Sequence, residues 1–217
     1  MSIYDFKSWK NRVMNRNDIT SMVTHLTKPD KVNLEYISED EVNIMAVDNL
    51  IKILGDRKIL GSDTQKGFIV GNMAAVCFQD APFSGIIQNV EYERQRRQED
   101  KYKKTRYCGI GLSFSKFHVF SQGGRPVIYE ETKKAKEMLP KDEHWRIVNF
   151  HIHPDDTNII DWTHEREWRA PIEFKIDWGL SHVVLYDKVC WDYFYANCPK
   201  EILKEIHGIT MLKSFLM

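Results

Sequence analysis

The sequence predicts an α+β fold in which helices near the N-terminus precede a mixed, mostly antiparallel sheet of about six strands. Residues 38–58 carry the clearest apolar repeat of helical period, whereas the later apolar segments are short and rich in β-branched and aromatic side chains. These segments lack a regular alternation of strand and helix, which favours α+β over a doubly wound α/β fold. The chain has 217 residues, 42% of them hydrophobic, so we expect residues 1–217 to form a single domain.

The N-terminal part is expected to hold two helices with a strand between them. Residues 2–15 place apolar side chains at roughly helical spacing behind a serine, a residue type that caps helices. Residues 38–58 begin with a Ser-x-x-Glu capping box. Residues 18–27 are rich in β-branched side chains and predict a strand, although Asp18 is equally suited to cap a helical turn.

The rest of the chain is expected to alternate irregularly between short strands and short helices. The predicted strands are residues 75–79, 107–115, 126–130, 145–153, 165–174 and 182–186. The predicted helices are residues 116–121, 131–138 and 199–206. Residues 180–217 therefore contribute a C-terminal strand plus helix.

The overall charge and the cysteines limit the classes of function. Lys and Arg total 31 and so do Asp and Glu, so no global electrostatic field points to nucleic acid or to an anionic membrane. The N-terminus lacks the apolar core of a signal peptide, and no run of about 18 apolar residues occurs. We therefore expect a cytoplasmic protein without a membrane partner. The four cysteines are far apart and fit reduced thiols better than a disulfide framework.

One basic stretch could act locally on nucleic acid. Arg94–Arg106 contains seven basic and two acidic residues, with Tyr92, Tyr102 and Tyr107 in or beside it. Such a segment can contact phosphates and stack on a base. The alternative is a solvated loop or a surface helix, because the stretch has no apolar periodicity.

Residues 165–169, Glu-Arg-Glu-Trp-Arg, are the most informative segment. In a strand, Glu165, Glu167 and Arg169 would share one face. Two neighbouring carboxylates raise one another's pKa and a guanidinium opposes that, so the trio could bind a sugar hydroxyl or stabilise a developing cation. The alternative is a solvent-facing strand with an ordinary ion pair, although the flanking tryptophans indicate partial burial.

Two further strands carry candidate site residues. Alternation would aim His25 and Thr27 the same way, either as a structural hydrogen-bonding pair or as part of a site. The strand at residues 75–79 runs into a turn and would present Phe78 and Asp80 at its C-terminal end. The alternative there is a core strand followed by a turn.

A metal site is the third alternative for this sequence. His151 and His153 have the spacing with which two imidazoles can share a metal from one strand, and Asp155 follows them. Because no third and fourth ligand is recognisable, a structural or surface role is the competing interpretation, and we predict no metal.

The order of the segments resembles the AbiGi-like abortive-infection proteins of bacteria, some of which are described as antitoxins. The resemblance spans residues 24–169, and V-C-F-x-D-x-P followed by Y-x-G-I-G-L is its most specific part. The matching segments are T-H-L-T at 24–27, A-V-D-N-L-I-K-I-L at 46–54, V-C-F-Q-D-A-P at 76–82, Y-C-G-I-G-L-S-F-S-K at 107–116, G-R-P-V-I-Y at 124–129 and E-R-E-W-R at 165–169.

A more distant resemblance, to the DarT-like toxins and poly(ADP-ribose) polymerases, implies an ADP-ribosyltransferase-like fold that uses NAD as substrate. His25, Asn49, Phe78 and Glu167 or Glu165 follow one another in the order typical of those enzymes. The resemblance implies that His25 bonds the adenosine ribose of NAD and that Phe78 stacks near the nicotinamide. It also implies that Glu167 stabilises an oxocarbenium-like transition state.

The same resemblance implies the remaining roles. Glu165 would be the second acid, oriented toward the acceptor, and Thr27, Asp80, Tyr129 and Arg169 would surround the bound NAD. Phe78 and Leu26 depart from the usual tyrosine and glycine.

Three functions follow from these patterns. The first is an NAD-using ADP-ribosyltransferase of bacterial or phage conflict that modifies a macromolecular acceptor or hydrolyses NAD. The second is a non-catalytic partner of a toxin or antitoxin, or a nucleotide-sensing binding protein. The third is a metal-dependent hydrolase or nuclease that uses His151 and His153.

Overall fold

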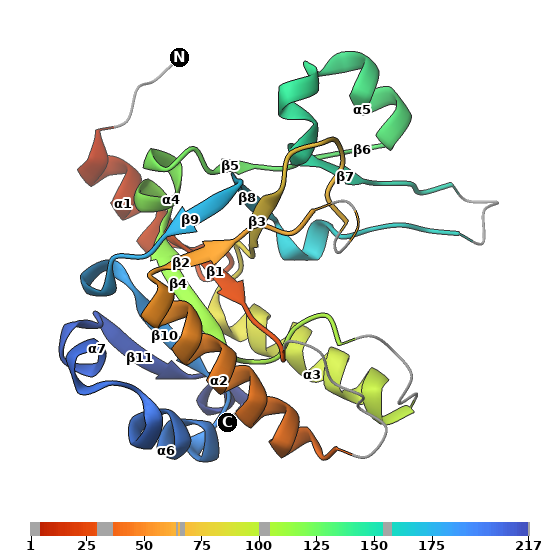
Figure 1. The fold of residues 1–217 in the computed structure, drawn as a ribbon. Helices are drawn as coiled ribbons and strands as arrows, with labels where there is room; N and C mark the ends of the chain where they lie inside the picture. Colours follow the sequence, from red (N-terminus) through yellow and green to blue (C-terminus); the bar gives the residue numbers. More distant parts are fainter. Residues whose placement is uncertain are drawn as a thin grey trace.

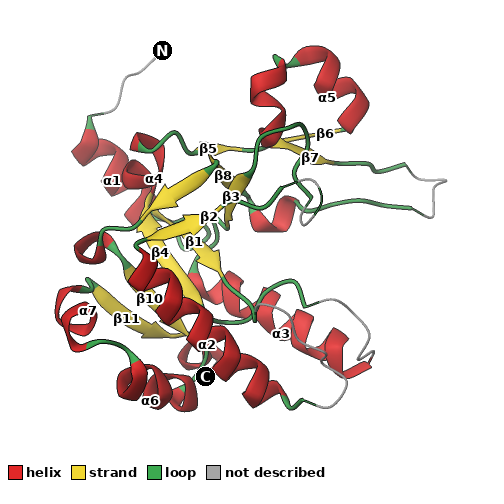
Figure 2. Ribbon diagram, viewed as in Figure 1, coloured by secondary structure: helices red, strands yellow, loops and turns green. Residues whose placement is uncertain are grey.

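The α+β class is confirmed, but the expected single sheet is wrong. The computed structural model describes residues 5–29, 37–63, 65, 68–99, 105–153 and 158–216. Within these residues the strands form four small sheets of four, three, two and two strands. Helices surround the strands (Figures 1 and 2), with α6 (Lys188–Asn197) and α7 (Lys200–Glu205) beside the C-terminal strands and α5 (Thr132–Met138) at the opposite end of the molecule.

The four-stranded sheet has the order β1-β4-β10-β11. β1 pairs antiparallel with β4, β4 antiparallel with β10, and β10 parallel with β11. The bounds are β1 Met22–Leu26, β4 Gly111–Ser115, β10 His182–Leu185 and β11 Gly208–Met211. β4 and β10 are buried almost throughout, because helices and neighbouring strands cover both of their faces.

A second sheet lies against the free edge of β1. Its order is β3-β8-β5, with β3 at Ala75–Phe78, β8 at Trp168–Pro171 and β5 at Arg125–Pro126. Thr24 and Gln79 exchange two backbone hydrogen bonds of 2.9 and 2.8 Å, which join β1 to the end of β3. This junction brings residues 24–28 next to residues 75–79, although about 50 residues separate them in the chain.

The two remaining sheets are pairs of short strands. β2 (Lys58–Leu60) pairs antiparallel with β9 (Glu173–Lys175), and β6 (Ile128–Glu130) pairs parallel with β7 (Ile147–Asn149). The predicted strands at residues 107–115, 126–130, 145–153 and 165–174 are therefore shorter than expected, and the last of them is split at Ile172. Ile172 has φ +66°, which interrupts extended backbone there.

The sequence predicted the longest helix well. α2 spans Glu39–Asp56, and the capping box is present: the Ser38 hydroxyl accepts from Glu41 N at 3.3 Å, and the Glu41 carboxylate accepts from Ser38 N at 2.7 Å. The apolar stripe faces the core through Val42, Ala46, Val47, Leu50 and Leu54. Arg57, in the left-handed conformation at φ 52°, ends the helix.

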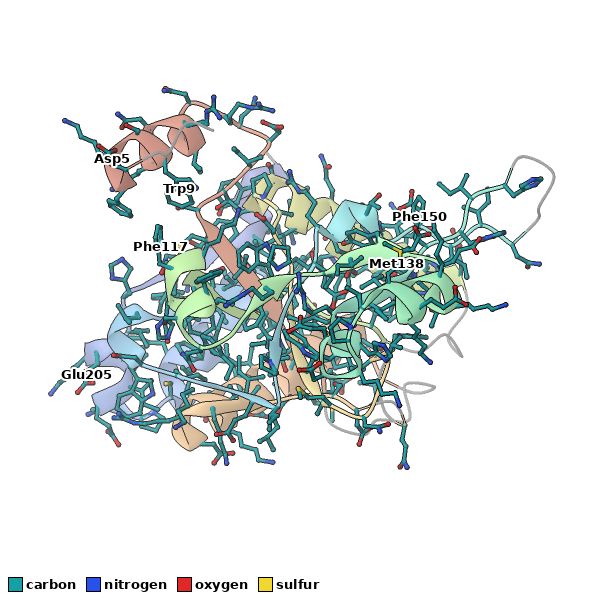
Figure 3. All side chains as sticks on the ribbon, turned by 90° about the horizontal axis from the view of Figure 1, so that it is seen from above. Asp5, Trp9, Phe117, Met138, Phe150 and Glu205 are labelled. Atoms are coloured by element: carbon teal, nitrogen blue, oxygen red, sulfur yellow. The ribbon has the colours of Figure 1, made fainter. Side chains whose placement is uncertain are left out.

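Helix α1 (Phe6–Met14) begins at Asp5, because the Asp5 side chain accepts from Ser8 N at 2.7 Å; Ser2, the expected cap, lies outside the described residues. Its contact with the body is aromatic. Figure 3 shows Trp9 opposite Phe117, which stands on α4 (Lys116–Ser121), and the two rings meet edge to face at 5.0 Å.

Two helices and two strands escaped prediction. They are α3 (Phe83–Glu99), α6, β2 and β11. α3 occupies the place of the expected turn and of the start of the basic stretch, and it buries Ile86, Ile87 and Val90 on one side. The remaining positions of α3 are mostly polar, so its apolar side is narrow. For that reason the sequence shows no clear helical repeat there.

Gly111 permits the close approach of β1 and β4, and the substitution Gly111→Ala is expected to lower the free energy of unfolding by about 1–3 kcal/mol. A Cβ at this position would lie 2.0 Å from the His25 carbonyl oxygen and 3.0 Å from Leu26 Cα, both of them backbone atoms. Urea unfolding of the variant measures the loss.

Gly55→Ala provides the matched control for that experiment. A Cβ at Gly55, in the last turns of α2, would meet nothing within 4 Å. Alanine there is expected to be neutral or to stabilise the protein by up to about 1 kcal/mol. Equal effects of the two substitutions would contradict the steric argument.

Candidate functional site

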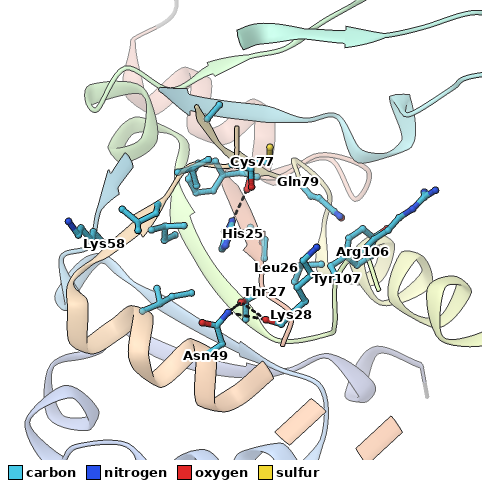
Figure 4. Close-up of a pocket in the computed structure, with 18 of the residues that line it drawn as sticks. His25, Leu26, Thr27, Lys28, Asn49, Lys58, Cys77, Gln79, Arg106 and Tyr107 are labelled. Carbon is cyan, nitrogen blue, oxygen red and sulfur yellow. Dashed lines mark hydrogen bonds between the residues drawn. The ribbon is translucent and has the colours of Figure 1, made fainter. Parts of the chain in front are cut away.

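A cleft of about 430 Å³ opens where β1, α2, β2 and β3 meet. β1 and the residues after it supply Thr24 to Pro29, and β3 supplies Ala75 to Gln79. The opposite wall comes from Arg106, Tyr107, Glu165 and Glu167, and the α2 and β2 side from Asn49, Lys52, Ile53, Asp56, Lys58, Ile59, Leu60 and Ser62. Figure 4 shows His25 in the middle of these residues, between Lys58 on one side and Arg106 on the other.

The His25 ring is fixed by a backbone carbonyl. Its Nδ1 lies 2.9 Å from the carbonyl oxygen of Cys77 (Figure 4). A carbonyl only accepts, so Nδ1 carries the proton. Burial lowers the pKa of His25, with the Cys77 contact opposing that effect. The ring is therefore neutral near pH 7, and its Nε2 is a hydrogen-bond acceptor.

Glu167 is held in a buried ion pair. Its two carboxylate oxygens accept from Arg169 Nε at 2.8 Å and Nη2 at 3.2 Å, and the two side chains are 8% and 3% exposed. Arg169 Nη1 donates to the carbonyls of Trp145 and Ile147 at 2.7 and 3.0 Å. Glu167 and Arg169 were predicted to share one face of a strand, and the structure shows their side chains in contact. The guanidinium orients the carboxylate.

Glu165 does not belong to the same strand face as Glu167, so that part of the prediction is wrong. Residues Thr163–Glu165 form a 3₁₀ turn, and Arg166 adopts φ 46° before β8 begins. Glu165 lines the cleft from this turn, and no side chain of the described residues forms a hydrogen bond or ion pair with its carboxyl group. Burial and the nearby charge of Glu167 raise the pKa of Glu165 to about 7, against the smaller effects of Arg106 and Arg169.

Phe78 is among the residues that line the cleft, but its ring lies in the core. Its ring is 1% exposed and packs edge-on against Phe114 and Phe174 at 6.2 and 5.2 Å. Only its edge approaches His25, at 6.0 Å between ring centroids. The aromatic residue that lines the opposite wall of the cleft is Tyr107.

Asp80 and Tyr129 lie behind the site, outside the lining of the cleft. Asp80 accepts from Trp168 Nε1 at 3.2 Å and pairs with Lys116 at 2.7 Å. The Tyr129 hydroxyl accepts from the backbone N of Glu167 at 2.8 Å, and burial raises the pKa of Tyr129 to about 12. Both residues therefore contact the segment around Glu167 from outside the cleft lining.

Thr27 and Asn49 support the cleft together. Asn49 Nδ2 donates to Thr27 Oγ1 at 2.8 Å and to the Lys28 carbonyl at 2.9 Å (Figure 4). These bonds tie α2 to the end of β1. Thr27 was expected near the ligand and lies in the lining, whereas Asn49 was noted only as part of a pattern.

Sequence reasoning missed the residues that complete the cleft. Gln79, Tyr107 and the lysines Lys28, Lys52 and Lys58 come from four different parts of the chain and form no motif. The one usable signal was local: Tyr107 follows the basic stretch directly and starts a predicted strand.

Within the described part of the basic stretch, three arginines pair with carboxylates. Arg97 binds Glu39 through two bonds of 2.9 and 2.8 Å and is only 6% exposed. Arg94 pairs with Glu91 at 3.2 Å and Arg96 with Glu93 at 3.5 Å. Residues 100–104 lie outside the described part of the chain.

The histidines at 151 and 153 lie away from the cleft lining. His151 Nδ1 contacts Glu131 Oε1 at 2.9 Å, and the backbone of His151 bridges to Ile160. Over the described residues no group of three or more His, Cys, Asp or Glu side chains could hold a metal ion, and Asp155 lies outside them. The four cysteines are unpaired thiols.

The fold and the cleft together define an α+β protein in which one histidine, three acidic residues and four basic residues line a shared cavity. No protein-family model, curated protein or solved structure matches the chain. Across the described ranges, no helix combines the length and the apolar character needed to cross a membrane.

Proposed function

We propose that the cleft binds NAD and cleaves the bond between nicotinamide and ribose, passing ADP-ribose to a macromolecular acceptor or to water. The observation that carries this proposal is that His25 and the two glutamates, about 140 residues apart in the chain, line one cleft. An acceptor histidine, carboxylates and lysines suit a ligand with ribose hydroxyls, a positively charged nicotinamide and two phosphates.

In the proposed reaction the bond from C1′ of the ribose to the nicotinamide nitrogen breaks, and its electron pair leaves with nicotinamide. The ribose passes through an oxocarbenium-like state, which nearby negative charge stabilises. An oxygen or nitrogen of the acceptor then bonds to C1′ and loses its proton. Glu165 supplies the uncompensated negative charge and can take that proton, because Glu167 is neutralised as a pair by Arg169.

The roles that we propose for Glu165 and Glu167 differ from the sequence-based expectation, which favoured Glu167 as the catalytic residue. Glu167 is buried and bound at both oxygens by Arg169, with its backbone held by Tyr129. In our proposal Glu167 organises the wall of the cleft and bonds the nicotinamide ribose, and Glu165 faces the reacting carbon and the acceptor.

The test is incubation of the full chain with NAD, with nicotinamide release measured by chromatography. Glu165→Gln is expected to lower the rate by about 100-fold or more, since it removes charge stabilisation of the transition state. Glu137→Gln is the matched control, because Glu137 is exposed on α5 and lies outside the cleft lining. The proposal would be overturned if NAD produced no nicotinamide release and also no thermal stabilisation of the chain.

A nucleotide-binding protein without catalysis is the second candidate function, either as a sensor or as a partner of a toxin or antitoxin. The observation that favours it is the occupation of both Glu167 oxygens by Arg169. It predicts that NAD raises the melting temperature although no nicotinamide is released.

A further inference from the structure

Asp80 contacts both ends of the segment that carries Glu165 and Glu167. Its backbone N donates to the Glu165 carbonyl oxygen at 3.1 Å, and its carboxylate accepts from Trp168 Nε1 at 3.2 Å. The same carboxylate oxygen pairs with Lys116 Nζ at 2.7 Å, and the Asp80 side chain is 16% exposed. Because Asp80 lies outside the cleft lining, it holds the segment from behind the wall that the segment forms.

The bond to Glu165 is out of register with the strand pairing beside it. β3 and β8 pair Phe78 with Trp168. From that pair to the bond between Asp80 and Glu165, the chain advances two residues on the β3 side, from 78 to 80, and goes back three on the other side, from 168 to 165. One extra residue on one strand is characteristic of a β-bulge, which re-aims the neighbouring side chains. Arg166, at φ 46°, lies within this bulge.

The bulge decides where the Glu165 side chain goes. In a regular strand residues 165 and 167 would share one face. In the structure Glu167 lies against Arg169, whereas Glu165 lines the cleft from a separate turn. A left-handed residue other than glycine is unfavourable by itself and persists only where surrounding contacts hold it. Asp80 supplies such contacts on both sides of Arg166.

We propose that Asp80 is a positioning residue, which fixes the bulge at Arg166 and so presents the Glu165 carboxyl to the cleft. Lys116 orients the Asp80 carboxylate, and no atom of Asp80 takes part in bond making or breaking. The inference rests on the proposed function for the use of Glu165 in the reaction. The placement of Glu165 can be measured without any reaction.

The placement of Glu165 has a signature that loss of stability alone would leave unchanged. Burial, and then the charge of Glu167, raise the pKa of Glu165 to about 7. The smaller effects come from Arg106, Arg169 and Glu93. If the bulge relaxes and the carboxyl moves into water, the largest of these effects is lost and the pKa falls.

The experiment is an NMR titration of the Glu165 carboxyl carbon in the full chain, with the signal assigned through Glu165→Gln. Trp168→Phe removes the Nε1 donor, keeps an aromatic ring and changes no charge. We expect the pKa of Glu165 to fall from about 7 to below about 6 in this variant and in Asp80→Ala. An unchanged pKa in the folded variants would overturn the inference. Melting curves check folding, and either variant decides alone if the other does not fold.

Asp187→Ala is the matched control. The Asp187 side chain is 17% exposed, accepts from Cys190 N at 3.2 Å, lies 4.0 Å from Lys213 Nζ and does not line the cleft. The control variant loses a hydrogen bond and an ion pair much as Asp80→Ala does, yet it is expected to keep the pKa of Glu165 at about 7. A fall as large as that in Asp80→Ala would assign the effect to general loss of stability and overturn the inference.

Nicotinamide release separates the inference from the proposed function. Trp168→Phe is expected to lower kcat by about tenfold or more and to leave KM for NAD within about twofold, because the residues that line the cleft are unchanged. A rise in KM at constant kcat would indicate a role in binding and overturn the inference. If the unaltered chain neither releases nicotinamide nor gains thermal stability with NAD, the proposed function fails, and the pKa of Glu165 in the variants still decides the inference.

Discussion

Arg169→Met lowers the free energy of unfolding by about 3–5 kcal/mol in our expectation, because it leaves a buried carboxylate without its partner. Arg169 binds both oxygens of Glu167 and two backbone carbonyls, and it is 3% exposed. Methionine fills much of the same volume, so loss of packing contributes little. Chemical denaturation at neutral pH measures the effect.

The double variant Glu167→Gln with Arg169→Met separates the charge from the shape. Removing the carboxylate charge as well is expected to restore part of the lost stability, since an isolated buried charge costs more than an absent pair. The exposed pair of Lys134 and Glu130 provides the control, and Lys134→Met is expected to cost less than about 1 kcal/mol. A loss in Arg169→Met no larger than in Lys134→Met would contradict a structural role for the buried pair.

The sequence predicted best those helices that are stabilised by residues within them or directly beside them. The capping box and apolar stripe of α2 lie within a single helix, and the structure places that helix within two residues of the predicted bounds. The short helix at residues 116–121 has the predicted bounds, and in the structure the Ser115 side chain caps it by accepting from His118 N. Pairing of the strands into four sheets depends on contacts between distant segments, which periodicity along the chain does not contain.

The residues of the candidate site show the same difference between what the local sequence predicts and what depends on contacts with distant segments. His25, Glu165 and Glu167 were recognisable from residue type and order, and the structure brings them into one cleft. The resemblance implied that Phe78 stacks on the ligand, and the alternative from the sequence was a core strand; the ring packs in the core against Phe114 and Phe174. A strand pattern shows that neighbouring residues face opposite sides, and it does not show which side the cleft takes.

The difference between Glu165 and Glu167 also has a non-local origin. An E-x-E pattern treats the two as equivalent, yet Arg166 in the left-handed conformation separates a turn from a strand between them. Glu167 then meets Arg169 and the hydroxyl of Tyr129, whereas Glu165 enters a cleft whose other wall comes from residues 24–29 and 49–62. The contrast in their surroundings makes the stability of the protein depend on pH through Glu165.

Glu165→Gln is expected to stabilise the protein by about 1–2 kcal/mol at pH 8 and to have almost no effect at pH 4.5. Folding raises the pKa of Glu165 from 4.5 to about 7, chiefly through burial and then through the charge of Glu167. The folded state therefore holds this proton more tightly than the unfolded state. The stabilisation is complete below pH 4.5 and is lost as the pH rises through 7. Glutamine resembles the protonated acid at every pH, so it keeps what the glutamate loses.

The size of the effect follows from the same pKa. A change from 4.5 to about 7 corresponds to about 3 kcal/mol, and access of water to the half-buried carboxyl reduces this to about 1–2 kcal/mol. Urea unfolding of both proteins between pH 4.5 and pH 8 gives the difference at each pH, with Glu137→Gln expected to stay within about 0.5 kcal/mol of the unaltered chain throughout. A difference that is constant with pH would contradict a raised pKa for Glu165. A gain in stability at pH 8 together with loss of nicotinamide release would show that the charge which destabilises the fold is the charge the reaction uses.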